Sequence, residues 1–183
     1  GYLAFLGRIS PEKRPDRAIA IAKRLGVPLK IAAKVDPADT RYYQEQIEPL
    51  LLGQKLVEYI GEISDDQKSE FLGGASALLF PIDWPEPFGL VMIEAMACSA
   101  PVIAYDCGSV PEIVEDGLTG FMVHDEDEAA AAVSRLDRLD RRAIRRRFEE
   151  RFSATAMARR YLDLYAGLGA DRSVPGVALA ANA

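Results

Sequence analysis

The feature that most constrains the fold is a regular alternation of short apolar runs with amphipathic stretches along the chain. The apolar runs are hydrophobic almost throughout rather than at every second position, which is typical of strands buried on both faces. The stretches between them carry apolar residues at helical spacing. Strands that alternate with helices predict an α/β domain: a Rossmann-like open parallel sheet of about six strands with helices on both faces.

Local signals set the boundaries of these elements. Pro15 and Gly26 suit the first turn and the end of a helix, Ser64 suits an N-cap, and Pro49 must kink or end the helix that contains it. The predicted strands are residues 2–7, 28–35, 55–61, 77–82, 101–105 and 120–123. The predicted helices are residues 14–26, 39–53, 64–75, 89–99, 110–116, 125–136, 140–152 and 153–168. We therefore expect one domain over residues 1–168 and a small, polar, disordered tail over 169–183.

Charge and cysteine content exclude several classes of protein. A net charge of −6 disfavours nucleic-acid binding, which needs a basic face. Cys98 and Cys107 lack the spacing of a zinc site or a disulfide framework, and they fit free thiols in a reducing, cytoplasmic compartment. We expect no transmembrane segment and no signal peptide. The chain begins with Gly1 inside an apolar run, so we expect an excised piece of a larger protein.

In open parallel sheets, ligands bind where the strands end. Directly after the first strand, Gly7 permits a tight turn, and Arg8 and Lys13 place two cations near the start of a helix. A helix N-terminus with two cations is a phosphate site. The alternative is that both are ordinary surface charges, and this segment alone leaves the two interpretations open.

After the fourth strand the chain turns into a helix at Gly89. The missing side chain lets a ligand approach the backbone. The amides of Phe88, Gly89, Leu90 and Val91 would then point at an anion.

Two acids flank this turn. Glu94 would lie within the helix, placed to accept hydrogen bonds from a diol such as a ribose, and Glu86 would lie at the mouth of the cleft. The alternatives are a buried acid paired with Arg or Lys for Glu94 and a solvated loop acid for Glu86. Glu62 and Ile63, after the third strand, give a weak signal for a backbone clasp on a flat base. Trp84 either walls the pocket or simply packs.

These segments resemble a known family. The stretches "FLGRISPEKRPDRAI" and "EYIGEISDDQKSEFLGGASALLFPIDWPEPFGLVMIEAMACSAPVIAYDCGSVPEIVEDGLTGFMV" are similar to the donor-binding domain of retaining glycosyltransferases of family 4, the glycosyl transferases group 1. The resemblance covers about residues 2–166. Its most specific motif is a pair of glutamates with seven residues between them, here Glu86 and Glu94.

The resemblance implies the C-terminal half of a GT-B fold, with the N-terminal acceptor domain absent, and a hexosyltransferase (EC 2.4) that uses a nucleotide-diphosphate sugar. It assigns Arg8 and Lys13 to the diphosphate and the leaving group, together with the amides of residues 89–91. It assigns Glu86 to the transferred sugar and Glu94 to the ribose. It implies no metal and no cofactor. We expect this chain alone to bind nucleotide weakly and to transfer no sugar.

Some positions depart from the family pattern. Arg14 follows Lys13 where most relatives have Gly, and "AAKVD" (32–36) stands where many have a Gly-rich turn, so UDP, GDP and ADP all remain open as the donor nucleotide. Two other functions remain as alternatives. One is an epimerase or phosphorylase of the same architecture, although a phosphorylase would need a cofactor-lysine context that this chain lacks. The other is a sugar-nucleotide-binding module without catalysis.

Overall fold

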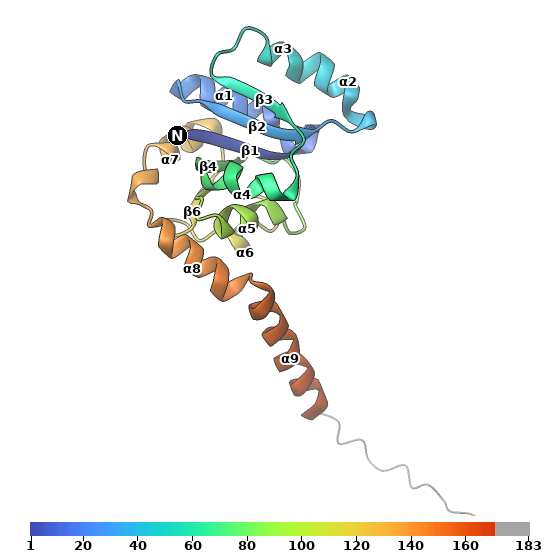
Figure 1. The fold of residues 1–183 in the computed structure, drawn as a ribbon, viewed down its shortest axis with the longest axis vertical. Coiled ribbons are helices and arrows are strands. Elements are labelled where there is room, and N and C mark those ends of the chain that lie inside the picture. The colour runs from blue at the N-terminus through green and yellow to red at the C-terminus, as the bar shows by residue number, and fades with distance from the viewer. Residues whose placement is uncertain (171–183) are drawn as a thin grey trace, which may run out of the picture.

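The structure is a computed structural model that describes residues 1–170, with side chains to Leu168. Its centre is a six-stranded sheet in the order β3-β2-β1-β4-β5-β6, and every strand pairing is parallel (Figure 1). The strands are β1 (Tyr2–Arg8), β2 (Leu29–Lys34), β3 (Val57–Gly61), β4 (Ala75–Phe80), β5 (Val102–Tyr105) and β6 (Gly120–Val123). This architecture confirms the predicted Rossmann-like α/β class.

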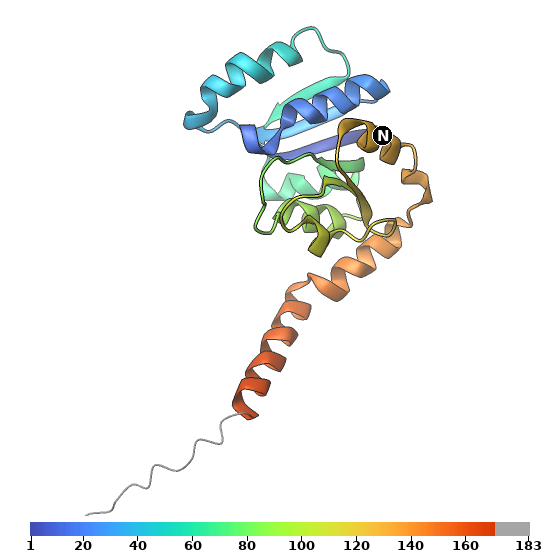
Figure 2. The same cartoon turned by 180° about the vertical axis from the view of Figure 1, so that it is seen from behind.

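Helices cover both faces of the sheet. Helices α1 and α7 contact each other on one face, and α4, α5 and α8 form a contacting series on the other (Figures 1 and 2). The α-helices are α1 (Pro15–Leu25), α2 (Thr40–Tyr42), α3 (Glu48–Leu51), α4 (Asp65–Gly73), α5 (Leu90–Ala97), α6 (Val110–Ile113), α7 (Glu126–Val133), α8 (Arg141–Arg151) and α9 (Ala154–Ala170). The 3₁₀ and π segments are η1 (Pro11–Lys13), η2 (Pro37–Asp39), η3 (Tyr43–Ile47) and η4 (Leu136–Arg138).

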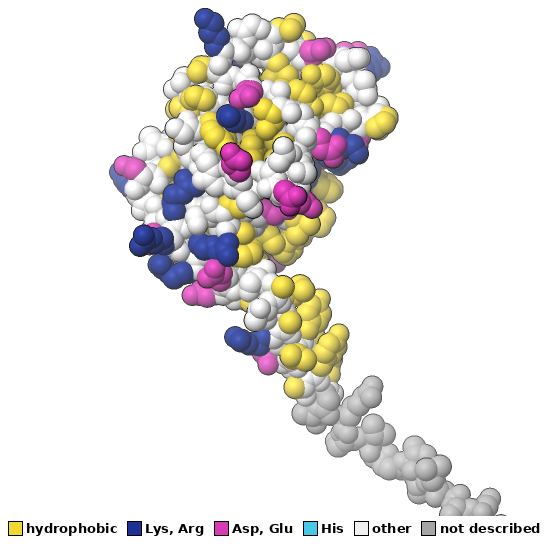
Figure 3. All heavy atoms as spheres, in the orientation of Figure 1, with side chains coloured by type: hydrophobic (Ala, Val, Ile, Leu, Met, Phe, Trp, Pro, Cys, Tyr) yellow, Lys and Arg dark blue, Asp and Glu magenta, His cyan; other side chains and the backbone are white. Residues whose placement is uncertain are grey.

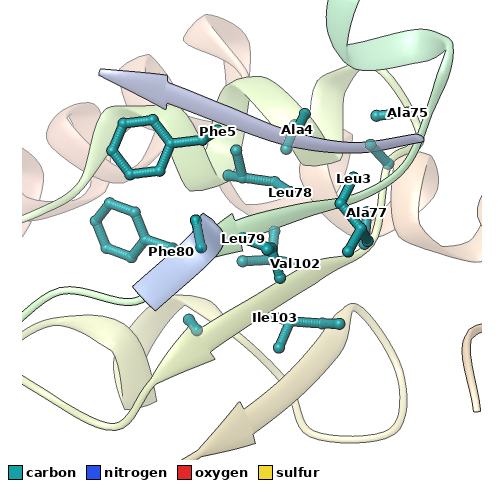
Figure 4. Close-up of a cluster of buried hydrophobic side chains, with 14 of the residues drawn as sticks. Leu3, Ala4, Phe5, Ala75, Ala77, Leu78, Leu79, Phe80, Val102 and Ile103 are labelled. Carbon is teal, nitrogen blue, oxygen red and sulfur yellow. The ribbon is translucent and has the colours of Figure 1, made fainter. Parts of the chain in front are cut away.

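The central strands form the core. Leu3, Leu78 and Val102, on β1, β4 and β5, have no exposed surface, and their side chains lie among those of neighbouring strands (Figure 4). Full burial of one such side chain stabilises the fold by about 2 kcal/mol. Because both faces are covered by helices, each strand can be apolar at consecutive positions.

The predicted helices 110–116 and 125–136 are shorter in the structure and end at Ile113 and Val133. Two larger differences lie at prolines. Strand β4 lies two residues earlier than the predicted 77–82 and ends at Phe80, since Pro81 has no N–H for the ladder. The predicted helix 39–53 is broken into η2, α2, the π-helical η3 and α3. Pro49 cannot donate to the carbonyl four residues back, and the wider π turn just before it accommodates that loss.

The other boundary signals are confirmed. Gly26 ends α1 in the left-handed conformation, at φ 65°. Ser64 precedes α4 in a capping box with Gln67, and the Ser64 N–H donates to Gln67 Oε1 over 2.9 Å.

Helix α9 leads away from the sheet and carries exposed apolar side chains along one side (Figure 3). These are Met157, Tyr161, Leu162, Leu164, Tyr165 and Leu168. Within residues 1–170 no helix combines the length and apolar character that crossing a bilayer requires. The helix continues past the predicted domain end at 168, and the remainder of the predicted disordered tail, residues 171–183, lies outside the described residues.

Candidate functional site

The candidate site lies where the strand order reverses. The chain runs from β1 outward to β2 and β3, and then returns to β4 on the other side of β1. Loops that leave neighbouring strands in opposite directions open a crevice at the carboxyl ends of those strands, where open α/β sheets bind ligands. The segments after β1 and β4 carry Arg8, Lys13, Glu86 and Glu94, so the fold itself brings them to this crevice.

The first part of the crevice is a hollow of about 320 Å³ between the ends of β1, β2 and β3 and the helices α4 and α5. It is lined by Leu6, Gly7, Arg8, Ala32, Ala33, Lys34, Glu62, Ile63, Asp65, Lys68, Val91 and Glu94. It thus brings together the three residues predicted to contact the nucleoside, Glu62, Ile63 and Glu94.

The second part is a hollow of about 390 Å³ over the loop that joins β4 to α5. It is lined by Leu6, Gly7, Arg8, Lys13, Phe80, Glu86, Pro87, Phe88, Gly89, Leu90 and Val91. The two hollows share Leu6, Gly7, Arg8 and Val91, so they adjoin along the end of β1. All the predicted site residues therefore line one of two adjoining spaces.

Glu86 is not a solvated loop acid, because its side chain is only 11% exposed. Its Oε2 accepts a hydrogen bond from the Lys13 ammonium and another from Trp84 Nε1, the latter over 2.9 Å. The Lys13 ammonium also lies 5.0 Å from the centre of the Trp84 ring. Burial of either charge alone would be costly, and the pairing compensates for it.

A second loop supports the backbone around Glu86. The Ser109 amide donates to the Glu86 carbonyl over 2.9 Å, and Ser109 Oγ donates to the Phe88 carbonyl over 2.8 Å. Gly108 adopts the left-handed conformation, and a Cβ there would lie 2.3 Å from the Glu86 nitrogen. The loop after β5 is therefore in backbone contact with the loop that carries Glu86.

Gly89 is the N-cap of α5, with φ 73° and ψ 62°. A Cβ on Gly89 would lie 2.6 Å from Met92 Cε, the end of a flexible side chain that can shift, so the left-handed conformation rather than the packing favours glycine here. The first amides of a helix have no carbonyl partner within it. At the start of α5 these amides belong to Leu90 and Val91, both of which line the second hollow.

Glu94 lies in α5 with its side chain 36% exposed. Lys68 Nζ donates to its Oε1 over 3.0 Å and contacts Asp65 Oδ1 over 2.8 Å. The hydrogen bonds to Asp65 and Glu94 raise the pKa of Lys68 above its ordinary value, so the ammonium is charged at neutral pH. Glu94 is thus paired with a cation, as the alternative interpretation predicted, but it is not buried and it lines the open hollow. Its contact with a ribose stays a prediction.

Arg8 is the last residue of β1, and half of its side chain is exposed. Its guanidinium donates to Glu12 over 3.0 Å and to Asp36 over 3.3 Å. It nevertheless lines both hollows. An anion in the crevice would therefore have to compete for Arg8 with two partly exposed carboxylates, and ion pairs that water reaches contribute little.

Four residues that hold this site together were not predicted from the sequence. These are Lys68, Gly108 and Ser109, and Trp84 as a hydrogen-bond donor. Lys68, Gly108 and Ser109 contact residues more than twenty positions away in the sequence, and the Trp84 contact depends on the orientation of its ring. No local sequence pattern therefore indicated these contacts. Over residues 1–170 there is no cluster of three or more His, Cys, Asp or Glu side chains that could hold a metal ion.

Comparison with known proteins adds an independent finding. Residues 1–154 match the family described as glycosyl transferases group 1. The alpha-maltose-1-phosphate synthase of Mycolicibacterium smegmatis is 33% identical over 140 residues, which are 73% of this chain and 36% of that protein. The D-inositol 3-phosphate glycosyltransferase of Streptomyces scabiei is 32% identical over 155 residues, which are 70% of this chain and 31% of that protein. The chain thus spans about a third of the length of these relatives.

Solved structures share the same fold. The sucrose-phosphate synthase of Thermosynechococcus elongatus superimposes with a TM-score of 0.78 and 28% identity, over 92% of this chain and 46% of that one. Anabaena HepE, solved in complex with UDP and glucose, also gives a TM-score of 0.78, at 22% identity and over 91% of this chain and 48% of that one.

Proposed function

The chain belongs to the glycosyl transferases group 1 family, and from this premise we propose that it forms the donor-binding half of a retaining GT-B glycosyltransferase. The donor would be a nucleotide-diphosphate sugar, bound in the two adjoining hollows. Its sugar would pass to an acceptor held mainly by an N-terminal domain of the same protein. Two free cysteines support a reducing, cytoplasmic setting for this reaction.

One observation carries the proposal. One crevice at the switch point of the sheet is lined by residues from separate segments of the chain. Lys13 comes from the segment after β1, whereas Glu86, Gly89 and Glu94 come from the loop and helix after β4. A sugar nucleotide has a nucleoside, a diphosphate and a sugar in a row. The crevice offers acids at both ends, with a cation and helix amides between them.

The proposed chemistry follows from these groups. Cleavage of the anomeric C–O bond leaves positive charge on the sugar and adds negative charge to the departing diphosphate. Arg8, Lys13 and the amides of Leu90 and Val91 are fixed donors at the position of that negative charge, so they would stabilise the transition state more than the ground state. The family resemblance, and no single residue, supports retention of the anomeric configuration and independence from metal.

The ion pair of Lys13 with Glu86 would change partners when the donor binds. In the ligand-free protein the two charges compensate each other. A sugar diphosphate would give Lys13 a phosphate oxygen and Glu86 a sugar hydroxyl instead. Lys13 would stay paired with an anion, and Glu86 would keep hydrogen bonds from the hydroxyl and from Trp84 Nε1, which lowers the cost of its buried charge.

An apolar surface beside the site is consistent with a second domain that packs against this one. A hollow of about 590 Å³ lies between the loop before α5 and helix α9, lined by Phe88, Leu90, Ile93, Arg151, Phe152, Met157, Arg160, Tyr161 and Leu164. Leu90 is 64% exposed, and an apolar patch of this kind is typical of an interface. We propose that the N-terminal domain covers it.

Titration calorimetry of this chain with UDP, GDP and ADP sugars tests the function. We expect weak binding of one nucleotide type and no sugar transfer. Glu94→Ala should weaken binding of the bare nucleoside and of the sugar nucleotide alike, because it acts on the ribose. Lys13→Ala should weaken the diphosphate forms only.

Lys55→Ala is the matched control, since Lys55 is exposed and lies outside both hollows. Equal losses for nucleoside and diphosphate forms in the Lys13 variant would contradict the assignment. If no nucleotide binds even to the protein with both domains, the chain is not a donor-binding domain. Sustained transfer by this chain alone would refute the need for a second domain.

A further inference from the structure

Arg14 has an unusual backbone conformation for a residue with a side chain. It lies between η1 and α1 at φ 51° and ψ 52°, and within residues 1–170 only Ser99 is another non-glycine residue with positive φ. The left-handed region is unfavourable for such residues, and Pro15 restricts the residue before it further. Glycine would adopt this conformation without strain. Strain of this kind persists only where surrounding contacts hold it.

The contacts of the Arg14 guanidinium keep its backbone in this strained conformation. Its Nε and NH2 atoms donate to both carboxylate oxygens of Asp16, over 2.7 to 3.1 Å, and its NH1 atom donates to Asp83 Oδ2 over 2.8 Å. A bidentate pair with a planar guanidinium sets direction as well as charge. Burial disfavours a charged Asp16, but the hydrogen bonds from Arg14 outweigh it and lower the pKa of Asp16, so the pair is ionised at neutral pH.

Asp83 connects this cluster to the other side of the crevice. It lies in the loop after β4, three positions before Glu86, and its amide donates to the Glu12 carbonyl over 2.9 Å. Arg17 adds a weaker contact to Asp83 over 3.4 Å. The segment that ends in Lys13 and the segment that leads to Glu86 are therefore joined behind the site, independently of the Lys13–Glu86 pair itself.

We propose that Arg14 is a positioning residue. Through its contact with Asp83, it fixes the position of Lys13 relative to Glu86 in the donor site. The proposal rests on the proposed function. Arg14 itself lines a separate hollow with Pro11, Asp16, Tyr42, Gln46, Leu50 and Asp83, and none of these residues lines the two hollows of the site. Arg14 thus acts on the donor through Lys13 and Glu86 without touching it.

Trp84 makes the proposal testable without any ligand. It is the only tryptophan of the chain, its indole N–H donates to Glu86, and its ring faces Lys13. Its indole ¹H–¹⁵N resonance and its fluorescence quenching by acrylamide therefore report on the surroundings of the Lys13–Glu86 pair. Far-UV circular dichroism during thermal unfolding reports separately on the fold.

The variants are Arg14→Gly, which removes backbone strain together with the guanidinium, and Arg14→Lys, which keeps only the charge. We expect Arg14→Gly to keep a thermal midpoint close to that of the wild type, because relief of strain offsets lost contacts. It should nevertheless shift the indole resonance, raise quenching about twofold, and weaken binding of UDP-glucose roughly tenfold, since small misplacements have large effects. Arg14→Lys should restore part of each change. UDP-glucose serves as the probe here; GDP- and ADP-glucose replace it if calorimetry selects another nucleotide.

Arg24→Ala is the control, because Arg24 lies near the end of α1, the helix that Arg14 precedes, and it pairs with exposed Asp127. Asp83→Asn tests the same link if Arg14→Gly does not fold. A folded Arg14→Gly or Asp83→Asn variant with the wild-type indole resonance and quenching would overturn the proposal. If Trp84 responds while no nucleotide binds to the wild type or the variant, even in the protein with both domains, the proposed function fails and the positioning of Lys13 and Glu86 by Arg14 stands.

Discussion

The contact between Gly108 and the Glu86 backbone allows a sharp test of how the site is held. In Gly108→Ala, the new Cβ would start 2.3 Å from the Glu86 nitrogen and 2.5 Å from its oxygen, whereas real Cβ contacts essentially never fall below 3.0 Å. One backbone must therefore move by at least about 0.7 Å, and neither partner is a flexible side chain. The left-handed φ of 61° adds strain of roughly 1–2 kcal/mol for alanine.

Overpacking adds about 1–3 kcal/mol to that strain, so we expect Gly108→Ala to lower the free energy of unfolding by about 2–5 kcal/mol. Urea unfolding followed by circular dichroism measures this loss. The displaced Glu86 should also change the fluorescence of Trp84, whose indole donates to it. In the protein with both domains, sugar transfer should fall by up to about 100-fold.

Gly117→Ala is the matched control. Gly117 has a φ of 73°, and a Cβ there meets nothing within 4 Å, so this variant has only the conformational strain, roughly 1–2 kcal/mol. The difference between the two variants isolates the contact with Glu86. Equal losses of stability, or an unchanged Trp84 signal in Gly108→Ala, would refute the reasoning.

Two further predictions concern stability. Glu115 accepts hydrogen bonds from Arg147 and Arg151, and although its burial opposes ionisation, these bonds lower its pKa below the ordinary value of 4.5. Glu115→Gln should therefore lose about 1–2 kcal/mol at pH 7, and the gap to the wild type should close as the pH falls through the lowered pKa; a constant gap from pH 7 to pH 3 in urea unfolding would contradict this. The Tyr2 hydroxyl donates to the Phe71 carbonyl over 2.5 Å, so Tyr2→Phe should lower the free energy of unfolding by about 1 kcal/mol. Tyr161→Phe, on exposed α9, should leave that free energy unchanged in the same assay. Equal losses in the two variants would refute the role of this bond.

The sheet and its helices were largely predictable from local pattern. Apolar runs of strand length, the Ser64 cap and Gly26 at a helix end act through neighbours in sequence, and the structure confirms them. The largest errors came at prolines. Pro81 ended a strand two residues before its predicted end, and Pro49 was compatible with a π turn that the sequence did not indicate.

The site was predictable in part. Glu86 and Glu94 stood out because acids are rare in apolar stretches, and strand ends are where α/β sheets bind ligands. Their pairing with cations did not stand out, although Lys13 itself was predicted as a site residue. Lys68 lies 26 positions from Glu94, and Lys13 lies 73 positions from Glu86, so no spacing along the chain links them.

The sequence by itself determined the alternation of strands and helices, and with it the edge of the sheet at which ligand-binding residues collect. It also carried the glutamate pair and the cations that indicate the family. Only the tertiary structure decided which cation neutralises which acid, and that Gly108, Arg14 and Asp83 hold the loops around them. The physical reason is range: strand, turn and cap preferences act between neighbours, whereas the pairing of buried charges depends on segments that meet only after the sheet has formed.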